Sequence, residues 1–93
     1  MPALARKGDP EVVHCATPYR QGHVKTVFAN GINLSCEGHS NTVHAGPVCV
    51  PHTAVLSKGS PNVYAEGIPV GRVGDPTCTS VAKGSPDCYA NGY

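Results

Sequence analysis

Hydrophobic residues fall in short runs that are separated by glycine and proline along the whole chain. Eleven Gly and nine Pro among 93 residues leave positions 23–30, eight residues, as the longest segment free of both. Because an α-helix in a globular protein averages about 11 to 12 residues, almost no helix is expected. The runs between the breaks carry Val, Tyr and Phe, which suit strands of about four to six residues. The pattern predicts an all-β protein.

One of these runs occurs three times. Its copies, at 27–31 (VFANG), 63–67 (VYAEG) and 88–92 (CYANG), each end in a turn dipeptide that typically closes a β-hairpin. A second phrase recurs as GDP, GHS and GDP, beginning at Gly8, Gly38 and Gly74, and the last two lie seven residues after the closing Gly of the first phrase. Three hairpin-sized copies in one register predict a body with approximate three-fold symmetry.

The apolar content is low for a chain of this length. Val, Ile, Leu and Phe together number eighteen, twelve of them Val, and there is no Trp. Residues 1–93 are therefore expected to form one domain with a thin core. A domain this lean usually needs a covalent or metal cross-link to stabilise it.

The charges are few and balanced. Seven basic and six acidic residues give a formal net charge of +1, and only Arg6 and Lys7 are adjacent basic residues, so nucleic acid is not expected as a partner. No apolar run approaches the roughly 18 residues of a membrane span, and residues 1–10 lack the apolar run of a secretory signal. Synthesis in a reducing compartment is expected, which makes a metal site a better first hypothesis than a disulfide framework.

Histidine and cysteine occur at related positions of the three copies. His14 and His44 each lie six residues after the Gly of the second phrase, and Cys78 lies four residues after Gly74. Related positions converge on the axis of a pseudo-symmetric body, and imidazole and thiolate are the donors that zinc prefers. His52 is the leading candidate for a fourth donor. The predicted zinc ligands are His14, His44, His52 and Cys78.

Other histidines and cysteines are also candidates for metal ligands. Cys49 is the main rival, because Cys49 and His52 have a Cys-x-x-His spacing, so that the site could hold two His and two Cys. Weaker rivals are His39, Cys15 and Cys36, followed by His23. A disulfide outside the site, such as Cys15 with Cys36, also stays open among Cys15, Cys36, Cys49 and Cys88.

Motifs for catalysis are absent from the sequence. There is no Gly-x-Ser-x-Gly elbow, no phosphate-binding loop and no His-Glu-x-x-His motif. Asp9 and Asp75 each follow the Gly of the second phrase, where bonding of the carboxylate to the local backbone explains them. A zinc site closed by four protein ligands leaves no position for a substrate, so the metal is predicted to be structural and the protein not an enzyme.

Taken together, these phrases resemble the PAAR-repeat proteins, a family named for a recurring Pro-Ala-Ala-Arg that precedes Gly-Asp. The frame is matched at 69–75 (PVGRVGD) and 3–9 (ALARKGD), and in a degenerate form at 33–39 (NLSCEGH). No copy is a literal Pro-Ala-Ala-Arg. The phrase KGSP, at 58–61 and 83–86, adds to the match, which covers essentially the whole chain.

The resemblance implies a small cone of short β-hairpins, with zinc held near its sharp tip by three His and one Cys. These ligands correspond to His14, His44, His52 and Cys78. The flat base of such a cone caps a trimeric β-helical spike protein (VgrG-like) of a type VI secretion system or of a contractile phage tail, one tip per trimer. The implied function is a tip that aids puncture of a target cell envelope and effector delivery.

Several further expectations follow from the resemblance. The protein would be a monomer by itself, would contact the target membrane transiently, and would have effector proteins as further partners. It would be made in the bacterial cytoplasm without a signal peptide and exported at the tip of the spike, or else carried at a virion tail tip. The alternative functions are a zinc-stabilised adaptor that recruits effector cargo to the spike and, third, an enzyme.

Overall fold

Three short antiparallel hairpins, joined by long irregular connections, make up the regular structure. The computed structural model describes residues 2–13, 15–46 and 49–90. The strands are β1 (Phe28–Ala29), β2 (Ile32–Asn33), β3 (His44–Gly46), β4 (Cys49–His52), β5 (Tyr64–Ala65) and β6 (Ile68–Pro69). They pair as β1 with β2, β3 with β4 and β5 with β6. The described residues contain no helix, which confirms the all-β prediction.

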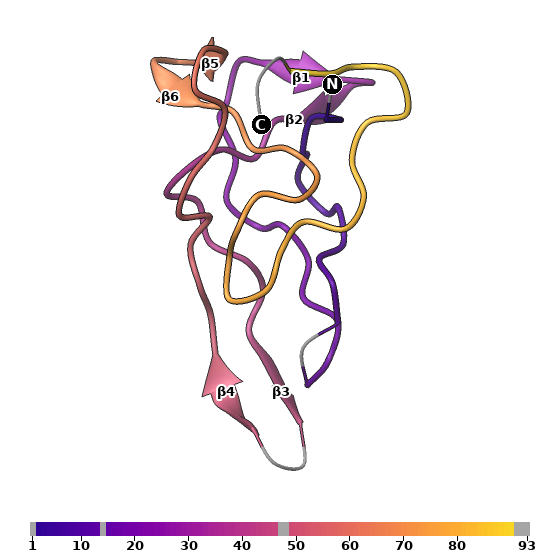
Figure 1. Ribbon diagram of the computed structural model, residues 1–93, viewed down its shortest axis with the longest axis vertical. Helices are drawn as coiled ribbons and strands as arrows, with labels where there is room; N and C mark the ends of the chain where they lie inside the picture. The colour runs from indigo at the N-terminus through magenta and orange to yellow at the C-terminus, as the bar shows by residue number, and fades with distance from the viewer. Residues whose placement is uncertain (1, 14, 47–48, 91–93) are drawn as a thin grey trace.

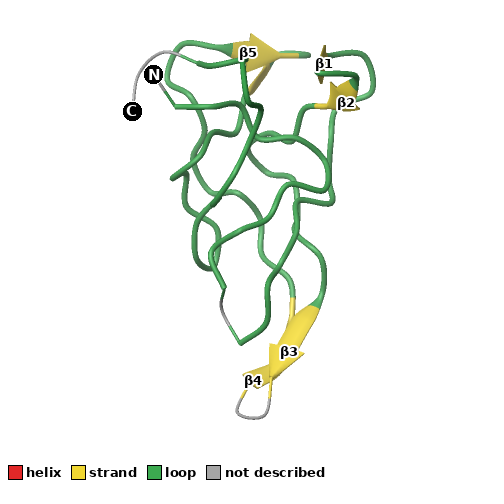
Figure 2. Ribbon diagram, turned by 90° about the vertical axis from the view of Figure 1, so that its right-hand side faces the viewer, coloured by secondary structure: helices red, strands yellow, loops and turns green. Residues whose placement is uncertain are grey.

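The body is a tapered cone, 37 × 24 × 21 Å along its principal axes. Hairpins β1–β2 and β5–β6 lie at the broad end and hairpin β3–β4 forms the narrow end (Figures 1 and 2). The described chain also begins and ends at the broad end, where the Ala90 N–H donates to the Pro2 carbonyl. Across the described ranges, no helix has the length and apolar character needed to cross a membrane.

The two hairpins at the broad end close as their repeated phrase predicts. Asn30 and Gly31 have φ of 56° and 75°, and Glu66 and Gly67 have φ of 53° and 79°. Positive φ at both central residues is the type I′ turn, whose twist matches that of paired strands. The corresponding dipeptide of the third copy, at 91–92, lies outside the described residues.

The pseudo-three-fold axis is marked by a closed ring of backbone hydrogen bonds. The Ala5 N–H donates to the Gly71 carbonyl (2.8 Å), the Gly71 N–H to the Ser35 carbonyl (3.1 Å), and the Ser35 N–H to the Ala5 carbonyl (3.0 Å). Each of these buried residues lies three positions before the Gly of the second phrase. One residue from each copy therefore meets the other two at the centre of the cone, which confirms the predicted symmetry.

The second phrase forms the same tight turn in all three copies. The Arg6 N–H donates to the Asp9 carboxylate and the Arg72 N–H to that of Asp75, each at 2.8 Å. In the middle copy the Cys36 N–H donates to Nδ1 of His39 at 2.9 Å. The two aspartates thus bond to the local backbone, as predicted from their position, and His39 replaces them in the degenerate copy.

The apolar core is small, as its composition predicts. One buried cluster contains Val24, Ala29, Leu34, Cys36, Ala65, Val70 and Ala90, and a second contains Ala5, Leu56 and Val81. Neither cluster includes a described residue of β3 or β4, the hairpin at the narrow end. That hairpin must therefore be held by interactions other than apolar burial.

Candidate metal centre

Hairpin β3–β4 brings two histidines face to face. His44 and His52 are direct partners in the strand register, so their side chains lie on the same face of the hairpin. The ring centroids are 4.1 Å apart with an interplanar angle of 63°. The segment between His44 and His52 therefore supplies two potential ligands from one copy of the repeat.

Both imidazoles present the same nitrogen to the centre of the site. Nδ1 of His44 lies 2.9 Å from the Thr42 carbonyl oxygen, and Nδ1 of His52 lies 2.9 Å from that of Val50. A carbonyl oxygen only accepts hydrogen bonds, so Nδ1 carries the proton in each ring and Nε2 carries the lone pair. A backbone carbonyl that orients an imidazole in this way is typical of metal-binding histidines.

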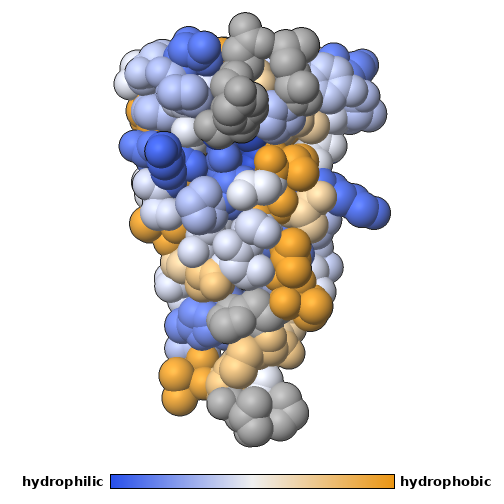
Figure 3. Space-filling view, in the orientation of Figure 1, coloured by the Kyte–Doolittle hydropathy of each residue, from blue (hydrophilic) through white to orange (hydrophobic). Residues whose placement is uncertain are grey.

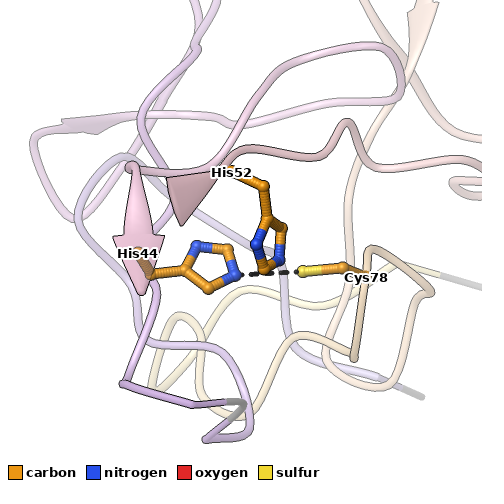
Figure 4. Close-up of side chains that lie close together, drawn as sticks. All are labelled: His44, His52 and Cys78. Atoms are coloured by element: carbon orange, nitrogen blue, oxygen red, sulfur yellow. Dashed lines mark hydrogen bonds between the residues drawn. The ribbon is translucent and has the colours of Figure 1, made fainter. Parts of the chain in front are cut away.

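Cys78 supplies a third donor from the third copy. It lies in an exposed turn between Pro76 and Ser80, and its Sγ atom is 3.4 Å from Nε2 of His44 (Figure 4). One ligand atom from each of His44, His52 and Cys78 lies within 4.8 Å of the others. Zinc bonds to nitrogen and sulfur at about 2.0 to 2.3 Å, so three donors at this separation can contact a common ion.

The fourth predicted ligand, His14, lies outside the described residues. Its neighbour Cys15 is described, and Cys15 forms a disulfide with Cys49 in β4, with the two Cα atoms 6.2 Å apart. Gly46 in β3 permits this approach, since a Cβ atom there would lie 3.0 Å from both Cβ and the carbonyl oxygen of Cys15. The chain around position 15 is thereby linked to the hairpin that carries His44 and His52.

The disulfide corrects two possibilities that the sequence left open. Cys49 is bonded to Cys15 and so does not replace a predicted metal ligand, although it has the right spacing from His52. The suggested pair of Cys15 with Cys36 is also wrong. Cys36 is fully buried in the core beside Val70, far from the narrow end, and burial raises the pKa of its thiol to about 11. The position of each cysteine in the folded chain, which sequence spacing does not reveal, decides which one pairs with Cys15.

The remaining rivals are engaged elsewhere. Nδ1 of His39 accepts from the Cys36 N–H, and burial together with the charge of Arg20 lowers the pKa of His39. Nδ1 of His23 donates to the Gln21 carbonyl at 3.1 Å. Neither histidine joins the cluster of His44, His52 and Cys78.

Sequence reasoning missed a buried polar side chain beside this site. Nδ2 of Asn41 lies 3.6 Å from Sγ of Cys78 and 3.0 Å from Oε1 of Glu11. A signal existed, because Glu11, Asn41 and Thr77 each lie three residues after the Gly of the second phrase. The three side chains differ in chemical type, so the sequence does not mark these positions as a repeated motif.

Two imidazole nitrogens and one thiolate make a donor set of intermediate softness. Such a set suits zinc and other late first-row metals better than calcium or magnesium, which prefer oxygen. Comparison with known proteins adds no family assignment: no protein-family model matches the chain, and no curated protein matches its sequence. The site and the repeat therefore carry the functional argument.

Proposed function

We propose that this protein is a non-enzymatic, zinc-stabilised tip that caps a trimeric β-helical spike, of a type VI secretion system or of a contractile tail. In this role it sharpens the spike, aids puncture of the target envelope and assists effector delivery. It would be made in the bacterial cytoplasm and exported with the spike, or assembled at a virion tail tip. The observation that carries the proposal is the backbone ring of Ala5, Ser35 and Gly71, which gives one chain a pseudo-three-fold axis.

That axis supports a three-fold partner. A single chain with three equivalent faces can match the end of a trimer one to one, because each subunit of the trimer meets a similar surface. A partner without three-fold symmetry would gain nothing from three related copies. The expected complex is one tip per trimer.

The broad end presents equivalent aromatic residues that fit such a contact. Phe28 in β1, Tyr64 in β5 and Tyr89 occupy the same position of the first phrase in the three copies. They are exposed by 53%, 58% and 49%. Aromatic side chains are enriched at the centres of protein interfaces. Three of them, related by the pseudo-symmetry, form a suitable base for a trimeric spike.

The narrow end has the character expected of a part that enters a membrane. Hairpin β3–β4 and the described residues around Cys15 and Cys78 that lie against it, at 12–13, 15–19, 41–46, 49–52 and 76–80, contain no Lys, Arg, Asp or Glu. Val13, Val43 and Val50 are exposed by 68%, 67% and 78%. Apolar side chains are visible over the narrow half of the face in Figure 3. A charge-free end lowers the cost of transient contact with lipid.

Zinc would stabilise this end in place of a core. We propose that His14 completes the site of His44, His52 and Cys78, supported by the disulfide that links its neighbour Cys15 to β4. Four protein ligands would leave no open position, so the ion would have a structural role. Binding of a structural zinc is worth about 10 kcal/mol or more in small domains.

The test is the stoichiometry of the complex with the cognate trimeric spike protein, measured by native mass spectrometry. One tip per trimer is expected. A triple variant at the broad end, with Phe28, Tyr64 and Tyr89 each changed to Ser, should weaken binding at least tenfold. A matched triple variant at the narrow end, with Val13, Val43 and Val50 changed to Ser, should bind the spike as the wild type does.

Two results would contradict the proposal. A stoichiometry other than one tip per trimer would remove the symmetry argument. Loss of a single effector from secretion after gene deletion, with other effectors still injected, would instead identify an adaptor that recruits cargo.

A further inference from the structure

A layer of polar side chains crosses the axis of the cone, directly beside the candidate metal centre. It contains one residue from each copy: Glu11, Asn41 and Thr77. Oε1 of Glu11 accepts from Nδ2 of Asn41 at 3.0 Å and from Oγ1 of Thr77 at 2.8 Å. The three copies thus meet through side chains here, as they meet through backbone at Ala5.

The layer is anchored by a buried ion pair. Nη1 of Arg20 donates to Oε2 of Glu11 at 2.9 Å, and both side chains are 0% exposed. Arg20 also donates to Oγ of Ser35 at 3.0 Å and to the His39 carbonyl. The Glu11 carboxylate is therefore paired with a guanidinium and accepts three hydrogen bonds, from Arg20, Asn41 and Thr77, which holds it in one orientation.

Asn41 can be oriented in only one way within this layer. Its Oδ1 atom accepts from the Ala54 N–H at 2.8 Å, and its Nδ2 atom faces the carboxylate of Glu11. A flipped amide would set Oδ1 against a carboxylate and Nδ2 against an N–H group, and both contacts would be repulsive. The second proton on Nδ2 is therefore available to the sulfur of Cys78, 3.6 Å away.

Thr77, which precedes Cys78 in the chain, fixes the turn that carries this cysteine. Its hydroxyl donates to Glu11 and accepts from the Thr79 N–H at 3.0 Å. The Thr77 N–H donates to the Thr79 carbonyl at 3.2 Å. The turn that carries Cys78 is thus tied to the axis on one flank, while Asn41 contacts the sulfur atom itself.

We propose that Asn41 is a positioning residue of the metal centre: it donates a hydrogen bond to the Cys78 sulfur and couples the site to the buried Glu11–Arg20 pair. The inference rests on the proposed metal binding and deepens it. A metal-bound thiolate keeps lone pairs that accept hydrogen bonds, and a donor held in place selects one direction of approach for the sulfur. Groups that orient a ligand in this way typically change metal affinity about 10- to 100-fold when removed.

The decisive measurement uses the wild-type chain loaded with NMR-active cadmium in place of zinc. A hydrogen bond from Asn41 to the metal-bound sulfur should give a scalar coupling between the cadmium nucleus and one side-chain amide proton of Asn41. No variant is needed for this experiment, so its outcome does not depend on whether a mutant folds.

Zinc affinity then measures how much the contact contributes. Asn41→Leu should raise the zinc Kd about 10- to 100-fold, measured by competition with a chromophoric chelator. The matched control is Ser35→Ala, which removes a buried partner of Arg20 and leaves the Asn41 contact with sulfur in place. Its zinc Kd should change by less than the roughly 10-fold that marks the loss of a group orienting a metal ligand.

The possible failures are distinguishable. A wild-type chain that binds neither zinc nor cadmium overturns the metal site, and this inference with it. A cadmium-loaded chain without coupling to Asn41 overturns the inference alone. So does an Asn41→Leu variant that folds and keeps the wild-type Kd.

Discussion

Nε2 of His44 lies 3.4 Å from Sγ of Cys78, although the two residues are 34 positions apart and belong to different copies of the repeat. The contact exists because neighbouring, though not equivalent, positions of the copies approach a common axis: His44 lies six residues after Gly38, and Cys78 lies four residues after Gly74. An ion bound between them would join the second copy to the third at the narrow end, where the apolar clusters do not reach. The consequences for stability can be measured directly.

Zinc should bind at about one ion per chain and stabilise the fold. At a free zinc concentration 100 times Kd, linkage predicts about 2.7 kcal/mol of added stability, because the ion binds the folded state alone. His52→Ala should abolish most of this gain, since it removes one donor of the cluster. Elemental mass spectrometry gives the stoichiometry, and urea unfolding with and without a chelator gives the free energy.

The matched control for His52→Ala is His23→Ala. His23 bonds to the Gln21 carbonyl and is not a member of the cluster, so this variant should keep the full stabilisation by zinc. Equal loss of zinc in both variants, or a wild-type chain without metal, would show that the cluster is not a metal site.

The disulfide between Cys15 and Cys49 should act as a second cross-link at the narrow end. Changing both cysteines to Ser should lower the free energy of unfolding by about 2–4 kcal/mol, since the bond closes a loop of 34 residues in the unfolded chain. Urea unfolding measures the difference under oxidising conditions. With excess reductant, the wild type should lose the same amount.

Cys88→Ser is the control for this pair. Cys88 is a free, partly buried thiol, so its replacement should leave the stability of the oxidised protein nearly unchanged. Thiol titration of the unfolded oxidised chain should find three free groups, at Cys36, Cys78 and Cys88. Five free thiols in protein purified without reductant would contradict the pairing.

Gly71→Ala should disturb the centre of the cone. A Cβ atom at position 71 would lie 2.5 Å from the Ser35 carbonyl oxygen and 2.8 Å from Cδ1 of Leu56. Crowding of this kind costs about 1–3 kcal/mol, because the ring of backbone hydrogen bonds cannot widen at one position alone. Amide hydrogen exchange should accelerate at Ala5 and Ser35 as well as at residue 71.

Gly67→Ala separates crowding from backbone strain. Gly67 has φ of +79°, and a Cβ atom there meets no atom within 4 Å. In Gly67→Ala, amide hydrogen exchange should accelerate only within hairpin β5–β6. If Gly71→Ala also changed exchange only near its own position, the three copies would not share a cooperative centre.

The carboxylate of Glu66 should make stability depend on acid pH. It accepts hydrogen bonds from the hydroxyl and N–H of Thr26 and from the N–H of Lys25, and these bonds lower its pKa from the ordinary value of 4.5. A lowered folded-state pKa means that the stabilisation is complete above about pH 4.5 and is lost as the pH falls through the folded value.

The measurement compares wild type with Glu66→Gln at equal metal loading. Thermal unfolding should show a smaller loss of melting temperature below pH 4.5 in the variant, because its side chain does not titrate. NMR titration of the Glu66 carboxyl should give a midpoint below 4.5 in the folded wild type. A midpoint at or above that value would contradict the expected sign.

Much of the fold was predictable because the signals are local and repeated. The spacing of Gly and Pro excludes helix, and Asn30-Gly31 specifies a turn by its own backbone preferences. Glu66-Gly67 is predicted as a turn by its equivalence to Asn30-Gly31 in the repeat. The cluster of His44 with Cys78 was predictable from the repeat together with donor chemistry, since Cys78 is the thiol that lies near, though not at, the position equivalent to His44 in the third copy. The contribution of His14 and the identity of the metal stay predictions.

Other features depended on distances that a sequence pattern does not contain. Cys49 has the spacing of a metal ligand, yet β4 places it against Cys15, and Cys36, which resembles any other cysteine in the sequence, is enclosed by the core. Arg20 lies outside both repeated phrases, and only folding brings its guanidinium to Glu11.

The repeats thus determined which positions are equivalent, since turn chemistry and strand length act between near neighbours. The tertiary structure decided which side chains pair across the axis, because hydrogen bonding, disulfide formation and metal binding all require approach within a few ångströms between residues far apart in the chain. Asn41 is the clearest case. Its partners Glu11, Ala54 and Cys78 lie 30, 13 and 37 positions away.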